Sequence, residues 1–460
     1  MDDLLDRDAS LVEVKELMLA RTGGNPLFIE ESARALIDGG AITRTGGKLA
    51  LAKRIEGIRI PHTVQSILAA RIDLLSPRDK TVLQTASVAG TTVGSALLFD
   101  VVSEPPPTVR RSLDRLCFAG FLGQVATPTG DEFVFKHPLI LEVAYNGILK
   151  SQRTQLHRRI VAAIERIHAS RLSEFAQRLA EHARQGEVWD KCARYLRLAA
   201  LNAYRRSANI EATRLFEQAL DALSMAQPSR ENSELRVDLC FDLRNSLLLI
   251  GELRKILSYL AQAEAVASEL QDERRLAKLA SNMSHAYWAI GDTRRALHYG
   301  EDALRFAERL NEPSLIVPAR YHVALAMSDL GQYAETNRRL QGLLGALRED
   351  QRHERFGLNA PLSVLGACYL VRSLAEAGEF ETALAEGQQG LEIAEEIDES
   401  FARAMIHLAL GYTGLVRGDT ASAIRHFERA QELFSALGNK TMLPVVRAFL
   451  GRAHLLAGAG

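Results

Sequence analysis

The sequence lacks the features that would place it in a membrane. Across its 460 residues, 47% of which are apolar, no uninterrupted apolar run approaches the roughly 18 residues of a membrane-spanning helix. The chain starts with acidic residues, Asp2, Asp3 and Asp6 after Met1, whereas a signal or transit peptide starts with basic ones. We therefore expect a cytoplasmic protein without a membrane partner.

Cysteines are few, and neither sign of charge is in excess. Cys117, Cys192, Cys240 and Cys368 are separated by 75, 48 and 128 residues, which fits neither the paired spacing of a zinc site nor a disulfide framework. The 56 basic and 57 acidic residues leave a net charge of −1, so no global field attracts nucleic acid or an anionic surface. We expect core thiols, no metal site, and partners selected by local surfaces.

Motifs for catalysis are also missing. A phosphate-binding loop needs the pattern GxxxxGK[ST], because backbone N–H groups, a lysine and a hydroxyl surround the phosphates. The nearest string, "TRTGGKLAL", has Leu49 after Lys48, and Ala41 and Ile42 stand where the leading glycine would fall. The string "ALLFDVV" has no second acid after Asp100, and the patterns HExxH and GxSxG are absent. We expect no nucleotide hydrolysis or cyclisation by this chain, and no cofactor bound by it alone.

A repeat runs through the second half of the sequence. A glycine is followed five residues later by a small or apolar residue and then by apolar residues at helical spacing, as in "GDTRRALHYGEDAL" and "GDTASAIRHFERAQ". Copies begin at Gly251, Gly291, Gly331, Gly378 and Gly418, in steps of 40, 40, 47 and 40. Each glycine predicts the end of a helix and a reversal of the chain, because glycine takes a positive φ without steric cost.

The helix after each glycine is expected to pack closely against its neighbours. Ala296 and Ala303 fall on one face of such a helix, as do Ala423 and Ala430, and small side chains let helices approach. We predict an α-solenoid of helical hairpins over 208–460, after connecting helical hairpins over 151–207. Solenoids expose a concave surface that binds a peptide or another domain, although a role as a mere spacer stays open.

These repeats resemble the tetratricopeptide repeat (TPR), with small residues at matching places, Phe427 at the large position and Tyr287 in the first helix of its unit. The 40-residue step exceeds the roughly 34 residues usual in that family, so longer helices or loops are expected. The resemblance implies a protein or peptide ligand in the groove. The string "SHAYWAIGD" offers Tyr287 and Trp288 as its anchor, and a core position is the alternative.

The first part of the chain predicts short helices and a hairpin. Helical spacing from Leu11 to Asp38 is broken by "TGGNP", where Asn25 suits a helix cap and Pro26 a first helical turn. The glycines in "AITRTGGKLALA" predict a small hairpin. Two helices then follow from Pro61, divided at Ser76-Pro77.

Residues 76–150 are expected to form a winged helix, in the order helix, helix, strand, wing, strand. The string "PPPTVRRSLDRLCFAGFLGQV" predicts a helix and a strand, and "DEFVFKHPLILEVAYNGIL" predicts a second strand that runs into another helix. Arg110, Arg111 and Arg115 lie on the candidate recognition helix and suit phosphates or guanine edges. Asp114 among them and the near-neutral chain argue against DNA.

Four strings together resemble the region downstream of the ATPase core in bacterial signal-transducing ATPases of the STAND type. They are "RTGGNPLFIEES", "IPHTVQSILAARIDLLSPRDKTVLQTASVAG", "FKHPLILEVAY" and "GEVWDKCARYLRLAALNAYRRSANIEATRLFEQAL". The most similar members carry an N-terminal class III adenylate or guanylate cyclase domain, an AAA-like ATPase and C-terminal TPRs. The resemblance implies that residues 1–75 end the helical lid of the ATPase and include a small hairpin. It also implies that an ATPase core, with its ATP or ADP, and an output domain lie upstream.

The same resemblance assigns site residues. Gly24 and Pro26 match the Gly-x-Pro motif of the lid, whose proline packs on adenine, and His137 in "FKHP" matches a winged-helix histidine that senses the β-phosphate of ADP. A helix-capping or core role is the alternative for His137. Arg71 is expected either to face the nucleotide or to pair with Asp73 or another carboxylate.

The fold expected is thus mostly α: a helical lid remnant, a winged helix and a TPR-like α-solenoid. The function expected is that of the regulatory, protein-interaction portion of a STAND ATPase linked to cyclic-nucleotide synthesis. A stand-alone TPR scaffold that binds a protein partner is one alternative, and a winged-helix transcription regulator is another. Met1 is either the natural start or the result of a truncation, and the sequence leaves both open.

Overall fold

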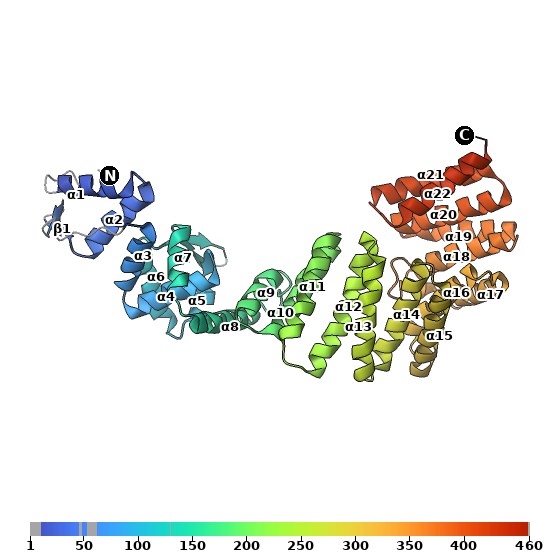
Figure 1. Ribbon diagram of the computed structural model, residues 1–460, viewed down its shortest axis with the longest axis horizontal. Coiled ribbons are helices and arrows are strands. Elements are labelled where there is room, and N and C mark those ends of the chain that lie inside the picture. Colours follow the sequence, from blue (N-terminus) through green and yellow to red (C-terminus); the bar gives the residue numbers. More distant parts are fainter. Residues whose placement is uncertain (1–10, 46–47, 53–61, 129, 459–460) are drawn as a thin grey trace. The chain divides into compact units, whose positions relative to one another are not determined.

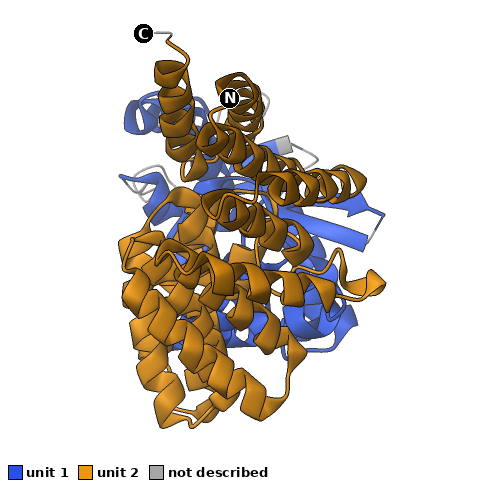
Figure 2. Ribbon diagram, turned by 90° about the vertical axis from the view of Figure 1, so that its right-hand side faces the viewer, with its two compact units in different colours: residues 1–195 blue, residues 196–460 orange. Residues whose placement is uncertain are grey.

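The structure is a computed structural model that describes residues 11–45, 48–52, 62–128 and 130–458. Helices dominate it, as predicted (Figure 1). It divides into two compact units, residues 1–195 and residues 196–460 (Figure 2). The finer domain boundaries given above stay predictions.

Unit 1 begins with the predicted helical corner and hairpin. Its elements are α1 (Val12–Thr22), α2 (Pro26–Asp38), β1 (Ile42–Thr45), β2 (Lys48–Leu51) and α3 (Val64–Asp73). Asn25 caps α2 as expected, since its Oδ1 accepts from the backbone N–H of Phe28 at 3.2 Å. The strands pair antiparallel, with Ile42 opposite Leu51. The hairpin glycines Gly46 and Gly47, and Pro61, lie outside the described residues.

A small helix-and-sheet group follows in unit 1. It comprises α4 (Pro77–Ala89), β3 (Thr92–Gly94), α5 (Ser95–Val101), α6 (Pro106–Phe118), β4 (Leu122–Thr127), β5 (Gly130–Phe135) and α7 (Pro138–Asn146). The three strands form an antiparallel sheet in the order β3-β5-β4. The two strands predicted on either side of the candidate wing are present as β4 and β5. Sequence reasoning missed β3 and α5, because three residues of strand show no alternation and "ALLFDVV" reads equally as strand or helix.

Three helices follow that group, α8 (Lys150–Ile167), α9 (Ala176–Gln185) and α10 (Trp189–Arg205). Helix α8 packs on α4 and α5, and α9 packs on α8. Within unit 1, Glu165 of α8 accepts from Lys191 Nζ at 2.7 Å and from the hydroxyl of Tyr195. The boundary between the units falls inside α10.

Unit 2 is a stack of helical hairpins, as predicted. Its helices are α11 (Asn209–Met225), α12 (Arg230–Ile250), α13 (Leu253–Glu269), α14 (Glu273–Ala289), α15 (Thr293–Leu310), α16 (Pro313–Asp329), α17 (Tyr333–Gly345), α18 (Leu362–Glu376), α19 (Phe380–Glu396), α20 (Ser400–Arg417), α21 (Thr420–Ala436) and α22 (Met442–Leu456). Each helix packs against the next along the chain. No helix among the described residues is long and apolar enough to span a membrane.

The repeat glycines end the first helix of each hairpin. Gly251, Gly291, Gly331, Gly378 and Gly418 have φ between 77° and 88°, which confirms the predicted left-handed turns. The 47-residue step also has a local explanation. Residues 346–361, which include a 3₁₀ turn (Glu349–Gln351), separate α17 from α18.

Small residues bring the hairpins together. Ala296 and Ala303 of α15 are fully buried, as are Ala423 and Ala430 of α21. Between the first two, a Cβ added to Gly300 would stand 2.9 Å from Cγ2 of Val323. The predicted close approach of neighbouring helices is therefore present, and it leaves the first helices of the hairpins to line the inner surface.

Candidate functional site

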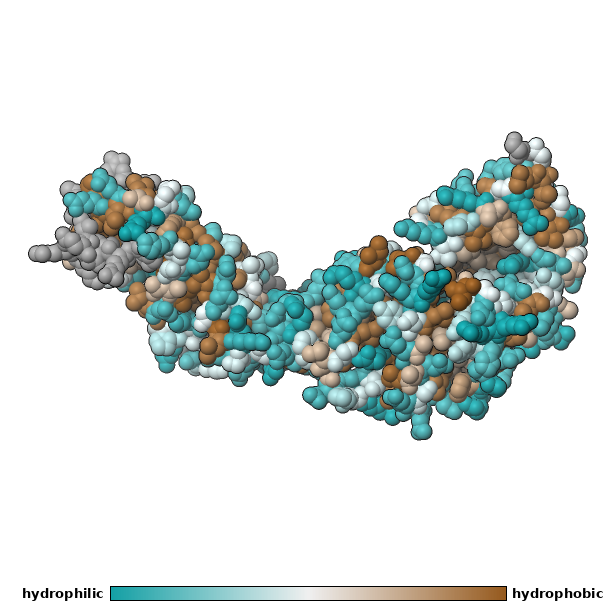
Figure 3. Space-filling model, viewed as in Figure 1, coloured by the Kyte–Doolittle hydropathy of each residue, from teal (hydrophilic) through white to brown (hydrophobic). Residues whose placement is uncertain are grey.

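A hollow of about 340 Å³ opens on unit 2. Most of its lining comes from the first helices of successive hairpins, α12, α14, α16, α18, α20 and α22. We call this hollow the concave groove. Brown, apolar side chains stand beside it in the right-hand part of Figure 3. A surface shared by so many repeats is a feature of the array and belongs to no single hairpin.

Aromatic rings form one wall of the concave groove. The ring of Trp288 meets that of Tyr369 edge-on at 5.7 Å between centroids, and Tyr321 meets Tyr369 at 5.8 Å. Farther along, Tyr412 meets Phe449 edge-on at 5.3 Å. Edge-to-face pairs hold rings rigidly, so this wall is preorganised to receive apolar groups.

A polar bridge crosses the same wall. The indole N–H of Trp288 donates to Oδ2 of Asp329 at 2.7 Å, and Arg372 donates to Oδ1 of the same carboxylate at 3.2 Å. The guanidinium of Arg372 also lies 5.5 Å from the ring centroid of Tyr412. The bridge therefore fixes Trp288 and Arg372 on α14 and α18 through one carboxylate on α16.

The last loop of the array returns to the groove. The hydroxyl of Thr441 donates to the backbone carbonyl of Leu248 at 3.3 Å, although 193 residues separate the two. Asn439 holds this loop, since its Oδ1 accepts from the backbone N–H groups of Thr441 and Met442 at 3.1 and 2.9 Å. All four residues line the groove, so the contact closes one of its sides.

Histidines and an arginine lie behind the aromatic wall. Arg244 donates to Nδ1 of His285 at 3.0 Å, and because arginine has no acceptor, His285 is neutral with its proton on Nε2. Burial, together with Arg244 and His322, holds the pKa of His285 well below its usual value. Burial also lowers the pKa of His322 to about 3, and Ser281 bonds to its Nδ1 at 2.9 Å.

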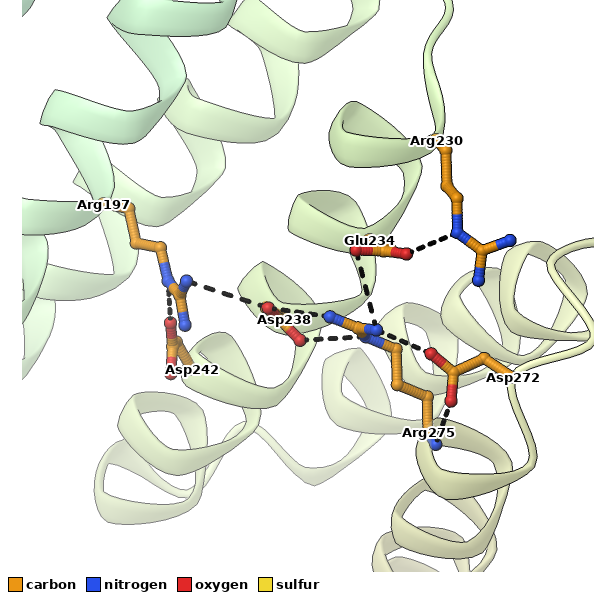
Figure 4. Close-up of polar contacts among 7 residues, drawn as sticks. All are labelled: Arg197, Arg230, Glu234, Asp238, Asp242, Asp272 and Arg275. Carbon is orange, nitrogen blue, oxygen red and sulfur yellow. Dashed lines mark hydrogen bonds and ion pairs between the residues drawn. The ribbon is translucent and has the colours of Figure 1, made fainter.

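One face of helix α12 carries three carboxylates that pair with arginines, and we call this set the charge ladder (Figure 4). Glu234, Asp238 and Asp242 follow one another at intervals of four residues on one face. Arg197 meets Asp242 at 2.6 Å, and Arg275 meets Asp238 at 3.2 Å. Burial raises the pKa of Asp242 although Arg197 opposes the rise. The ladder ties α10, α12 and α14 together, and its charges are mutually paired.

The two predicted anchors of the groove point to different surroundings. Trp288 lines the groove, whereas Tyr287 stacks on Tyr299 at 5.4 Å and lies under the guanidinium of Arg295. Both are half-buried. Sequence reasoning did not identify Tyr369, Arg372 or Arg244. A charged residue such as Arg244 on the buried face of a helix, between Leu243 and Leu247, was the available signal.

The residues predicted to contact a nucleotide lie in unit 1. Gly24 takes a φ of 81° before α2, and Pro26 is exposed in the first turn of that helix. His137 caps α7, since its Nδ1 accepts from the backbone N–H of Leu139 at 3.1 Å. Among the described residues, no hydrogen bond or ring contact joins His137 to Gly24 or Pro26.

Arg71 pairs with carboxylates, but not with Asp73. It bonds to Glu31, to Oδ2 of Asp38 at 2.8 Å and to the backbone carbonyl of Ala119 at 2.7 Å, and it is almost fully buried. Asp73 pairs instead with Lys80 at 2.6 Å. Arg71 therefore ties α2 and α3 to the chain after α6.

The arginines of the candidate recognition helix are mostly paired. Arg110 bonds to Asp131 and to Asp114, and Arg115 makes two bonds to Asp79 at 2.6 and 3.0 Å. Arg111 bonds to a backbone carbonyl of its own helix. The part of the chain that the structure describes contains no cluster of three or more metal-ligating side chains.

Comparison with known proteins agrees with the helical-repeat fold. No model of a known protein family matches the chain. An uncharacterised protein of Rhizobium meliloti (strain 1021) is 26% identical over 335 residues, which cover 72% of this chain and 32% of that protein. The chain thus spans about a third of the length of this curated relative.

Among solved structures, a signal transduction ATPase with numerous domains from Pyrococcus horikoshii, which carries a TPR sensor, superposes with a TM-score of 0.52 at 13% identity. The match covers 98% of this chain and 61% of that one. At this identity the likeness concerns the fold. The chain is mostly α, with a TPR-like α-solenoid, and it shares the fold of a STAND protein with a TPR sensor.

Proposed function

We propose that this chain is the regulatory and protein-interaction portion of a STAND-type signalling ATPase, and that its concave groove holds a peptide or protein segment. The observation that carries the proposal is the aromatic wall of Trp288, Tyr369 and Tyr412, built from three hairpins and braced by Asp329 and Arg372. Rigid rings with a polar edge suit apolar side chains joined by a polar backbone.

Within unit 1, residues 1–75 are proposed to be the lid end and residues 76–150 the winged helix of that ATPase. The element order α4, β3, α5, α6, β4, β5 and α7 and the fold of the P. horikoshii protein support this assignment. Gly24, Pro26 and His137 are proposed to contact the adenine and phosphates of ATP or ADP once the ATPase core is present. The output linked to it is proposed to be cyclic-nucleotide synthesis. The paired Arg110 and Arg115 favour this role over DNA binding.

Selection from a displayed library of random dodecapeptides on the immobilised chain tests the groove. We expect the selected peptides to lose binding at least tenfold to Trp288→Ala, and to keep it with Tyr287→Ala, whose ring faces Tyr299. Equal loss with both variants, or selection of no peptide, would argue against the groove as the binding surface.

Calorimetric titration with ADP and ATP tests the nucleotide role. We expect no binding heat and no turnover from this chain alone, because it has no phosphate-binding loop. We expect ADP binding when the proposed ATPase core is joined to it, and weaker binding with His137→Ala. Turnover by the chain alone that a substitution in it abolishes would contradict the proposal.

A further inference from the structure

Arg244 is a buried arginine without a carboxylate partner. Its exposed fraction is 7%, and its bonds go to Oδ1 of Asn245 and Nδ1 of His285, each at 3.0 Å. A guanidinium has five N–H donors, so these two bonds leave most of its donors without an acceptor. No carboxylate of the described residues forms an ion pair with it. Asp242, the acid nearest to it in the sequence, pairs with Arg197.

Burying an unpaired charge is costly, so proteins rarely keep one without a use. Arg71, the comparable buried arginine of unit 1, bonds to both Glu31 and Asp38. Each arginine of the ladder in Figure 4 likewise has its own acid. Arg244 is the exception among these, and its counterion is therefore expected from outside the chain.

The groups around Arg244 add donors rather than acids. His285 has its Nε2–H free of the bond to Arg244 and lines the groove. Nε2 of His322, whose residue is only 3% exposed, has no hydrogen-bond partner among the described residues. Tyr204 and Lys278 interact electrostatically with the same guanidinium. An unpartnered buried nitrogen close to an unpaired guanidinium is a second, independent sign of a missing hydrogen-bond partner.

Arg244 is also adjacent to the concave groove. Leu248, one helical turn after it on α12, lines the groove, as does its partner His285. Arg244 is not itself a lining residue and lies behind His285, so an acceptor that enters the groove beside His285 approaches the guanidinium.

We propose that the concave groove recognises an acidic side chain of the bound peptide, which pairs with Arg244 and accepts a hydrogen bond from Nε2 of His285. This inference rests on the proposed function. The aromatic wall would take the apolar side chains of the peptide, and the Arg244 end of the groove would select Asp or Glu over their amides.

Two pools of fluorescent dodecapeptides test this proposal. Both are acetylated and amidated, so that no terminal carboxylate is present. They are randomised alike, except that one fixed central position is Glu in the first pool and Gln in the second. We expect the immobilised chain to retain the Glu pool at least tenfold better, Arg244→Met to remove that difference, and Arg214→Met to preserve it. Arg214 is an exposed arginine of α11 and serves as the matched control.

If both pools are retained equally and Trp288→Ala abolishes that retention, the acidic preference is overturned, while the groove still stands as the binding surface. Retention of neither pool would overturn both proposals. A Glu preference that survives in Arg244→Met would also overturn the inference.

Thermal unfolding followed by the fluorescence of Trp288, in a Trp189→Phe background, separates a binding role from a structural one. Arg244 has no counterion in the free chain. Arg244→Met should therefore raise the melting temperature of unit 2 by a few degrees, while it lowers the retention of the Glu pool. A lower melting temperature would mean that Arg244 supports the fold, and it would overturn the proposal.

Discussion

The indole of Trp288 donates to Asp329 at 2.7 Å, and this bond joins the first helices of two successive hairpins. Asp329 also accepts from Arg372 of the following hairpin. One carboxylate therefore sets the positions of two groove-lining side chains that are 84 residues apart in the sequence. The arrangement of the groove thus depends on the stacking of the repeats.

We expect Asp329→Leu to lower the free energy of unfolding of unit 2 by about 1–3 kcal/mol, because it leaves the Trp288 N–H and Arg372 without their acceptor. Asp329→Asn keeps an acceptor oxygen and should cost less. Trp288 emission in a Trp189→Phe background measures both, and should shift only for the leucine variant. Equal effects of the two variants would mean that the bond does not position the ring.

Gly291→Val should destabilise unit 2 by more than about 1 kcal/mol, because a β-branched residue resists positive φ. Its φ is 84°, and a Cβ there would meet no atom within 4 Å, so the cost arises from the backbone alone. Gly342→Ala, in the exposed interior of α17, should instead be neutral or stabilising. Urea unfolding followed by Trp288 compares the two, and an unchanged midpoint for Gly291→Val would contradict the expectation.

Arg71→Met should destabilise unit 1 by about 3–5 kcal/mol, since it leaves the buried carboxylate of Glu31 without its partner. Lys80→Met removes the exposed pair with Asp73 and should cost less than about 1 kcal/mol. Unfolding followed by Trp189, in a Trp288→Phe background, measures both. A small loss for Arg71→Met would show that Glu31 accepts a proton or finds water instead.

The stability of unit 1 should fall with acid. His157 and His182 are buried and share a bond of 2.8 Å between their Nδ1 atoms. Burial lowers the pKa of His157 to about 4 and that of His182 to about 3, with His157 adding to the second shift. The unfolded chain therefore binds protons below about pH 6.5, where the folded chain does not.

The free energy of unfolding of unit 1 should therefore not depend on this histidine pair above about pH 6.5. Below that pH it should decrease toward pH 4, by up to about 1.4 kcal/mol per pH unit for each histidine. Urea unfolding followed by Trp189 at pH 7, 6 and 5 measures the slope. The double variant His157→Phe/His182→Leu should flatten it. A wild-type slope of zero over this range would contradict the pKa shifts.

The local backbone conformation could be predicted from the sequence wherever a single residue favours one conformation. The five repeat glycines take positive φ, Asn25 caps α2, and the hairpin closes between Ile42 and Leu51 as predicted. The capping role left open for His137 is also present in the structure. Short elements such as β3 were not predicted, because three residues are too few to show a hydrophobic period.

Pairings between distant residues were decided only by the tertiary structure. The sequence determined that unit 2 is a stack of hairpins turning at glycines, because glycine takes a positive φ without steric cost whatever packs around it. It did not determine that Thr441 meets Leu248, that Arg71 takes Glu31 and Asp38 rather than Asp73, or that Arg244 has no acid. The contact of Thr441 and the surroundings of Arg244 depend on the small rotation between successive hairpins, which accumulates along the array. The pairing of Arg71 depends instead on the packing of α2 against α3 in unit 1.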